Sequence, residues 1–98
     1  MIGKSVYKLQ EMSKLETYYI VFSSITHAMR LEKRTKQVGK RCTIVRTPSE
    51  FAIGGCGYSI RVDSEEYAYY IYHETINQNV KPLGLFCIKN NTEVSRLI

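Results

Sequence analysis

The order in which two apolar periodicities follow one another constrains the fold of this chain more than any other feature of its sequence. Alternating apolar and β-branched residues predict strands over 17–23, 41–45, 58–62 and 83–88. Apolar residues spaced three and four apart predict helices between Ser24 and Gly39 and over 64–77. The order strand-helix-strand-strand-helix-strand is that of the ferredoxin-like α+β fold, a four-stranded antiparallel sheet with two helices on one face.

Short capping signals mark the ends of these elements. Thr47-Pro48-Ser49-Glu50 has the form of a capping box with proline at the first helical position, so a single helical turn through Phe51 is expected after the second strand. Asp63 and Glu66 repeat the capping-box spacing at the start of the second helix. The helical residues expected to enter the core are Ala28, Leu31, Thr35 and Val38, and Ala68, Ile71, Tyr72 and Thr75.

Length and composition limit the chain to one small domain. Its 98 residues are 44% hydrophobic, enough for a core without disulfide staples. Residues 1–16 are expected to form a tail or short helix before a single domain at 17–98, and they lack the apolar centre of a signal peptide. Apolar residues of the tail recur every three positions, at Val6, Leu9, Met12 and Leu15. No segment approaches the roughly 20 apolar residues of a membrane span.

The three cysteines form no CxxC pair. This argues against a disulfide framework and against a dedicated zinc site, so no metal or other cofactor is expected, and a reducing cytoplasm is the simplest location. Cys42 and Cys87 alternate in phase with aliphatic strand residues and are expected in the core. Motifs for triads, paired carboxylates, P-loops or dinucleotides are absent, so a carrier or binding protein is expected rather than a self-sufficient enzyme.

Cys56 differs from the other two, because three glycines surround it in Gly54-Gly55-Cys56-Gly57. Glycine allows φ > 0 and close approach, so such a loop would expose the sulfur and present bare amide N–H groups that favour an anion. Arg46 and Arg61, on either side of the loop, would favour the reactive thiolate. Cys56 is therefore the candidate carrier thiol, with Gly54, Gly55, Gly57, Arg46 and Arg61 as expected binding groups. The alternative is a glycine-rich turn with an incidental cysteine.

The net charge of +5 is unevenly distributed. Basic residues crowd into a dozen positions of and after the first helix, at Arg30, Lys33, Arg34, Lys36, Lys40 and Arg41. A solvated helix face is the simplest explanation. The alternative is a docking surface, formed by Arg30, Lys33, Arg34 and Lys36, for an acidic protein or a nucleic acid.

Four segments of the chain together carry a family resemblance. They are a Tyr-Tyr-Ile-Val-Phe strand, Ser24-x-x-His27-Ala28, Thr47-Pro48 and Cys56-Gly57-x-Ser59-Ile60-Arg61. Within 17–88 they resemble the selenium/sulfur (Se/S) carrier-like protein family. The resemblance implies a cytoplasmic protein whose Cys56 holds sulfur or selenium as a persulfide or selenosulfide and passes it between donor and acceptor proteins. Similar sequences have a basic residue directly after Thr-Pro, where this chain has Ser49.

Two other functions stay open from the sequence. Ferredoxin-like sheets can bind RNA by stacking bases on exposed aromatic rings, and this basic chain has eight tyrosines. It has no RNP1-like sequence, so nucleic acid is the weaker expectation. The other alternative is a regulatory protein-interaction module in which the Gly-Gly-Cys-Gly segment is only a structural turn.

Several predicted strands are apolar on both sides, although the helices can cover only one face of the sheet. Tyr19 and Val21 in the first strand, and Phe86 and Ile88 in the last, alternate with core residues. An apolar face of this size predicts a partner, and a two-fold homodimer is the commonest solution. The alternative is that the N-terminal tail folds across the face.

Overall fold

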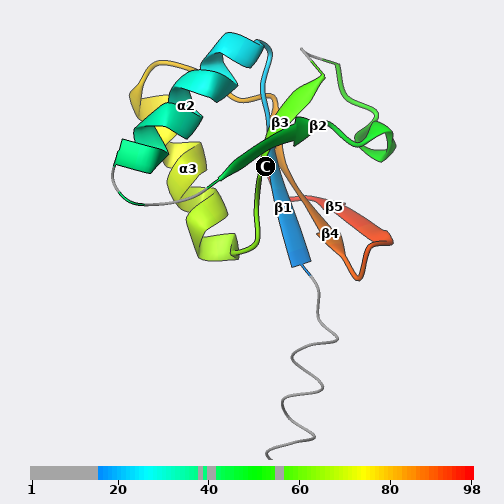
Figure 1. Cartoon of the computed structure of the whole chain (residues 1–98). Coiled ribbons are helices and arrows are strands. Elements are labelled where there is room, and N and C mark those ends of the chain that lie inside the picture. The colour runs from blue at the N-terminus through cyan, green and yellow to red at the C-terminus, as the bar shows by residue number, and fades with distance from the viewer. Residues whose placement is uncertain (1–15, 38, 40–41, 55–56) are drawn as a thin grey trace, which may run out of the picture.

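The computed structural model describes residues 16–37, 39, 42–54 and 57–98 of the chain. Its elements follow in the order β1 (Glu16–Val21), α2 (Ile25–Gln37), β2 (Thr43–Arg46), the 3₁₀ turn η1 (Ser49–Phe51), β3 (Tyr58–Val62), α3 (Glu65–Asn77), β4 (Gly84–Lys89) and β5 (Glu93–Arg96). The strands form one antiparallel sheet in the order β2-β3-β1-β4-β5, and both helices lie on the same side of it (Figure 1). The predicted α+β class with two helices is confirmed.

The predicted four-stranded sheet is wrong, because the polar C-terminal end of the chain forms a fifth strand, β5. Asn90 and Asn91 turn the chain back onto β4, and both adopt the left-handed backbone conformation, with φ of 52° and 62°. Asparagine tolerates this conformation better than most residues, and hairpin turns require it. Arg96 then holds the strand in place, with its guanidinium 5.1 Å from the centre of the Phe86 ring.

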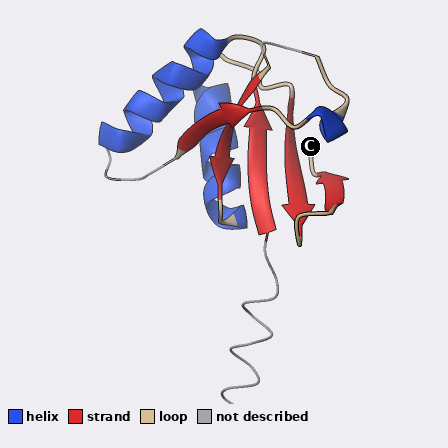
Figure 2. Cartoon of the chain, turned by 45° about the vertical axis from the view of Figure 1, so that its right-hand side comes forward, coloured by secondary structure: helices blue, strands red, loops and turns tan. Residues whose placement is uncertain are grey.

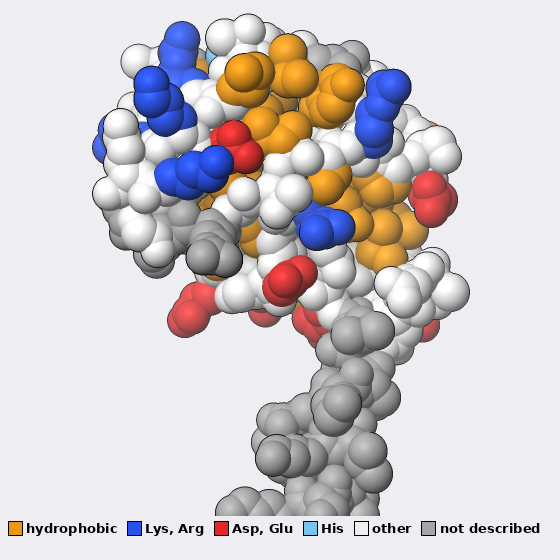
Figure 3. Space-filling view, in the orientation of Figure 1, with side chains coloured by type: hydrophobic (Ala, Val, Ile, Leu, Met, Phe, Trp, Pro, Cys, Tyr) orange, Lys and Arg blue, Asp and Glu red, His pale blue; other side chains and the backbone are white. Residues whose placement is uncertain are grey.

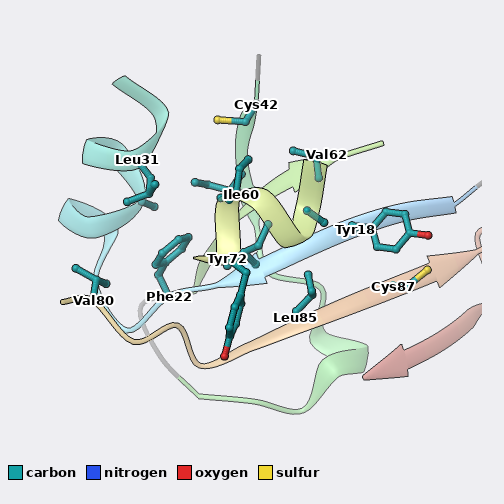
Figure 4. Packing of buried hydrophobic residues seen from close by; sticks show 14 residues of the cluster. Tyr18, Phe22, Leu31, Cys42, Ile60, Val62, Tyr72, Val80, Leu85 and Cys87 are labelled. Atoms are coloured by element: carbon teal, nitrogen blue, oxygen red, sulfur yellow. The ribbon is translucent and has the colours of Figure 1, made fainter. Parts of the chain in front are cut away.

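The main core lies between the sheet and the two helices (Figure 4). The register places Ile20, Ile60 and Leu85 side by side on three neighbouring strands, and all three are fully buried. Each such side chain stabilises the fold by about 1.5–3 kcal/mol through its removal from water. The predicted helical core residues are buried as well, except Val38, which lies outside the described residues.

The capping residues of α2 are the predicted ones, but the N-terminal cap of α3 differs from the prediction. The Ser24 hydroxyl accepts a hydrogen bond from the Thr26 amide at 3.2 Å, as an N-cap should, and Gly39 follows the end of α2 with φ of 79°. At α3 the cap is Ser64, whose hydroxyl accepts from the Tyr67 amide at 3.2 Å. The expected cap at Asp63 is therefore wrong by one residue, because α3 begins at Glu65 rather than at Ser64.

A smaller, aromatic cluster lies on the other face of the sheet, beneath the turn η1. Figure 2 shows this short turn apart from the two long helices. The Phe51 ring stacks on Phe86 with centroids 4.3 Å apart and meets Tyr19 edge-on at 5.3 Å. Val21, beneath them, is fully buried. Part of the apolar face is thus covered by the loop between β2 and β3, an arrangement that the sequence did not predict. The N-terminal tail lies outside the described residues.

Candidate functional site

The loop between β2 and β3 contains the Gly-Gly-Cys-Gly segment, and hydrogen bonds close it at its base. The Thr47 amide donates to the Gly57 carbonyl at 2.9 Å, and the Thr47 and Ser59 hydroxyl oxygens lie 2.6 Å apart. The loop therefore leaves and re-enters the sheet at one point, at the upper end of β2 and β3 (Figure 1). Gly55 and Cys56 lie outside the described residues.

The predicted helical turn through Phe51 is confirmed, but the capping box that predicted it is not. Pro48 is the N-cap of η1, and no side chain caps the turn. The Thr47 hydroxyl instead pairs with Ser59, whose side chain is fully buried and needs a hydrogen-bond partner. Ser49, where the family resemblance leads us to expect a basic residue, is exposed with its hydroxyl 3.3 Å from the Glu50 carboxylate.

The two described glycines of the loop have different roles. Gly57 has φ of +83°, in the left-handed region that side chains with a Cβ rarely adopt. An added Cβ there would lie 3.9 Å from Nη1 of Arg46, so the backbone conformation rather than the space requires glycine. Gly54 is exposed, and an added Cβ would meet nothing within 4 Å.

Only one of the two predicted arginines lies at the root of the loop. Arg46 ends β2 beside Gly57, and its guanidinium is 5.3 Å from the centre of the Tyr58 ring. Arg61 is three residues further along β3 and pairs with Tyr19 across the sheet. Since alternate residues of a strand face opposite sides, the register places Arg46 and Arg61 on opposite faces. Of the two predicted arginines, Arg46 is the one beside Gly57, the glycine that follows Cys56 in the sequence.

The other two cysteines lie in the main core, as predicted. Cys42 is 9% exposed and Cys87 is 1% exposed. Burial raises the pKa of the Cys42 thiol, although its hydrogen-bond contact with the Thr35 hydroxyl, at 3.1 Å, acts in the opposite direction. Burial also raises the pKa of the Cys87 thiol. Both thiols are therefore protonated at neutral pH, and a protonated buried thiol is a poor nucleophile.

Sequence reasoning did not predict what holds this loop to the sheet. Phe51 stacks on the open face, and Thr47 and Ser59 pair at the base. Two signals were present: an aromatic residue inside an otherwise polar turn, and a serine at a strand position that the register buries. Together these contacts fix both ends of the segment that contains Cys56.

The predicted basic docking residues lie on α2, which packs against β2 and β3, the strands that the loop connects. Arg30, Lys33 and Lys36 are exposed. Arg34 donates from Nε to the Glu74 carboxylate of α3 at 2.9 Å, so part of its charge is compensated. Figure 3 shows Lys and Arg side chains gathered over α2 next to hydrophobic ones.

No three His, Cys, Asp or Glu side chains in the described part of the chain are placed to hold a metal ion. Within the same residues, neither helix has the length and apolar composition that crossing a membrane requires.

Fold and site together define a small α+β domain with a glycine-rich, cysteine-containing loop between two strands. The profile of the family described as "Putative Se/S carrier protein-like" matches residues 17–87, from β1 into β4. The chain belongs to this family. No curated protein and no solved structure is similar enough to add a second comparison.

Proposed function

We propose that the chain is a sulfur or selenium carrier that holds the atom on Cys56 as a persulfide or selenosulfide and passes it between partner proteins. The observation that carries this proposal is the contrast between the thiols. Cys42 and Cys87 are buried, and burial raises their pKa values. Cys56 instead belongs to the glycine-rich segment between β2, which ends at Arg46, and β3. The description of the family to which the chain belongs, a selenium or sulfur carrier-like protein, supports the carrier role in general.

The transfer step needs no external oxidant. The Cys56 thiolate attacks the outer sulfur of a donor protein's persulfide, a new S–S bond forms as the donor's S–S bond breaks, and the electron pair leaves with the donor thiolate. Transfer of selenium from a donor selenosulfide has the same balance. The Arg46 guanidinium favours the anionic forms, and the amides of Gly54, Gly55 and Gly57 are the proposed ligands of the terminal anion. Arg61 faces the other side of the sheet and would act only at longer range.

The burial of the other two thiols also suits a carrier. A neighbouring thiolate would attack the persulfide, release the carried atom and leave a disulfide. Cys42 and Cys87 are protonated in the core and cannot perform this attack in the folded state. Because this chemistry requires reduced thiols, we propose the cytoplasm as the location.

Intact-protein mass after incubation with a cysteine desulfurase and cysteine tests the proposal. The native chain should gain the mass of one sulfur atom, which a reductant such as dithiothreitol removes. Cys56→Ser should gain nothing, whereas Cys42→Ala and Cys87→Ala should behave like the native chain. The proposal is wrong if the adduct forms on Cys42 or Cys87, or if the native chain forms none. A parallel reaction with a selenium donor distinguishes the two cargo atoms.

We also propose that the chain forms a two-fold homodimer through the part of the open face that η1 leaves uncovered. Ile88 and Val94 pair across β4 and β5 there, and Val94 is 39% exposed. Sedimentation equilibrium on the full chain and on a chain that starts at Leu15 separates this proposal from its alternative. A monomeric full chain that associates only after truncation would support a tail folded over the face and refute the dimer.

A further inference from the structure

The end of α3 separates two hollows of different chemistry. One, of about 390 Å³, is lined by Ile76, Asn79, Val80 and Lys81. The other, of about 210 Å³, is lined by Arg30, Lys33, Arg34, Gln37 and Gln78. Since residues 76–81 are consecutive in the chain, the two hollows flank the same turn. We call these nine residues the α2–α3 surface.

The first hollow is lined by a solvent-exposed aliphatic side chain, that of Ile76. Ile76 is 46% exposed although α3 buries its other face in the core. Val80, at 7% exposure, is part of the main core and gives the hollow a fixed floor. An exposed aliphatic side chain beside a buried apolar floor offers an anchor point for an apolar side chain of a partner.

The second hollow offers hydrogen-bond donors and positive charge. Among the described residues, only Arg34 of its three basic residues forms a salt bridge, with Glu74. Nε2 of Gln78 is buried and has no hydrogen-bond partner within the described structure. Arg30 and Lys33 are exposed, so a carboxylate of a partner supplies both an acceptor and the complementary charge there.

We propose that the α2–α3 surface binds an acidic, amphipathic segment of a partner protein. A leucine-like side chain of that segment enters the hollow at Ile76, and its carboxylates pair with the exposed Arg30 and Lys33. The inference rests on the proposed function in one respect, that a carrier must dock on its donor and acceptor. The surface itself does not include the loop with Cys56.

A protein fits this surface better than a nucleic acid. A phosphate backbone would pair with the cations but would leave the aliphatic hollow unfilled, and bases bind on exposed aromatic rings. Phe51 and Phe86, which could form such a platform on the sheet, are buried and stacked on each other. Charge complementarity together with an aliphatic anchor therefore favours an acidic peptide.

Amide chemical shifts of the isotope-labelled full chain test the proposal with three probes. They are a short peptide of glutamates with leucines at helical spacing, the same peptide with alanine for leucine, and oligouridylate. The leucine peptide should shift the amides of residues 30–37 and 76–81. Its affinity should fall about tenfold in Lys33→Glu, a loss of about 1.4 kcal/mol, and by a similar factor in Ile76→Asp.

Lys89→Glu provides the matched control, because it makes the same charge change at the other end of α3, where Lys89 and Glu65 line a separate small cavity. It should change the affinity less than about twofold, which is under 0.5 kcal/mol. Ile76→Ser replaces Ile76→Asp if the latter does not fold. Equal binding of the alanine peptide, equal effects of Lys33→Glu and Lys89→Glu, or tighter binding of oligouridylate would each overturn the proposal. Cys56→Ser should bind the peptide like the native chain, so a failure of sulfur transfer and a failure of docking are separate results.

Discussion

The two faces of the sheet are covered in different ways. On one face, two 13-residue helices enclose a mainly aliphatic core. On the other, a single 3₁₀ turn places Phe51 over Phe86, and Arg96 lies on the same ring. The helix-covered core contains residues from Tyr18 to Leu97, whereas the aromatic cluster on the other face depends on the turn η1 and on Arg96. The comparison indicates that the scaffold and the anchor of the cysteine loop are separately stabilised.

The first prediction concerns the helix-covered face and has the largest expected effect. Phe22 is fully buried between the sheet and the helices. Phe22→Ala should lower the free energy of unfolding by about 3–5 kcal/mol, because it removes a large apolar side chain and leaves a cavity. Urea unfolding measures this loss. A loss of less than about 1 kcal/mol would show that the main core does not dominate stability.

The second prediction concerns the η1-covered face. Phe51→Ala should lower the free energy of unfolding by about 2 kcal/mol, less than Phe22→Ala, because a surface turn relaxes more easily than a core. It should also change the alkylation rate of Cys56, since the anchor of its loop is lost. Phe51→Leu keeps an apolar side chain and should lie between the two. If Phe51→Ala lowers the free energy of unfolding as much as Phe22→Ala, the cores on the two faces of the sheet unfold as one cooperative unit.

The third prediction tests the base of the loop. Gly57→Val should lower stability by about 1–2 kcal/mol, because a β-branched residue resists the φ of +83°. We expect a larger effect on the alkylation of Cys56 than on folding. Gly54→Ala is the control, since a Cβ there meets nothing within 4 Å. Unchanged alkylation and thermal stability in Gly57→Val would exclude a role for the loop backbone.

The fourth prediction, with the smallest expected effect, concerns pH. Burial raises the pKa of the Cys42 and Cys87 thiols in the folded state, so folding favours their neutral forms. This contribution is fully present below the unfolded thiol pKa of about 8.5, and it is lost as pH rises through the folded value. Stability should therefore decline at alkaline pH, and less steeply in Cys42→Ala. Parallel pH profiles of the two chains would contradict this.

The sequence predicted those strands and helices in which the spacing of apolar residues shows which side chains are buried. Tyr58–Val62 was predicted with the bounds that the structure has, because its alternation lies between Gly57 on one side and Asp63 on the other. Strand β5 was missed because all four of its residues are exposed and carry no apolar pattern. Its signal lay in the turn, where Asn90 and Asn91 adopt the left-handed conformation that favours a hairpin.

The candidate site was predictable in composition but not in geometry. The glycine at 57 signalled positive φ, and the structure has it. Arg46 and Arg61 looked equivalent, since both lie near the loop in sequence, yet the pairing register decides which face each occupies. Register depends on contacts between distant strands, which no local pattern contains.

The position of β1 in the sheet has a consequence for synthesis of the chain. Among the described strands β1 leaves the ribosome first, but it lies in the middle of the sheet and its partner β4 begins only at Gly84. Until β4 emerges, β1 has one edge unpaired, and an unpaired apolar strand such as Tyr18–Val21 is a template for pairing with other chains. A nascent or prematurely terminated chain that ends before Gly84 should therefore aggregate, whereas one that ends after Lys89 keeps β1 paired on both edges and should lose β5 and the core contact of Leu97.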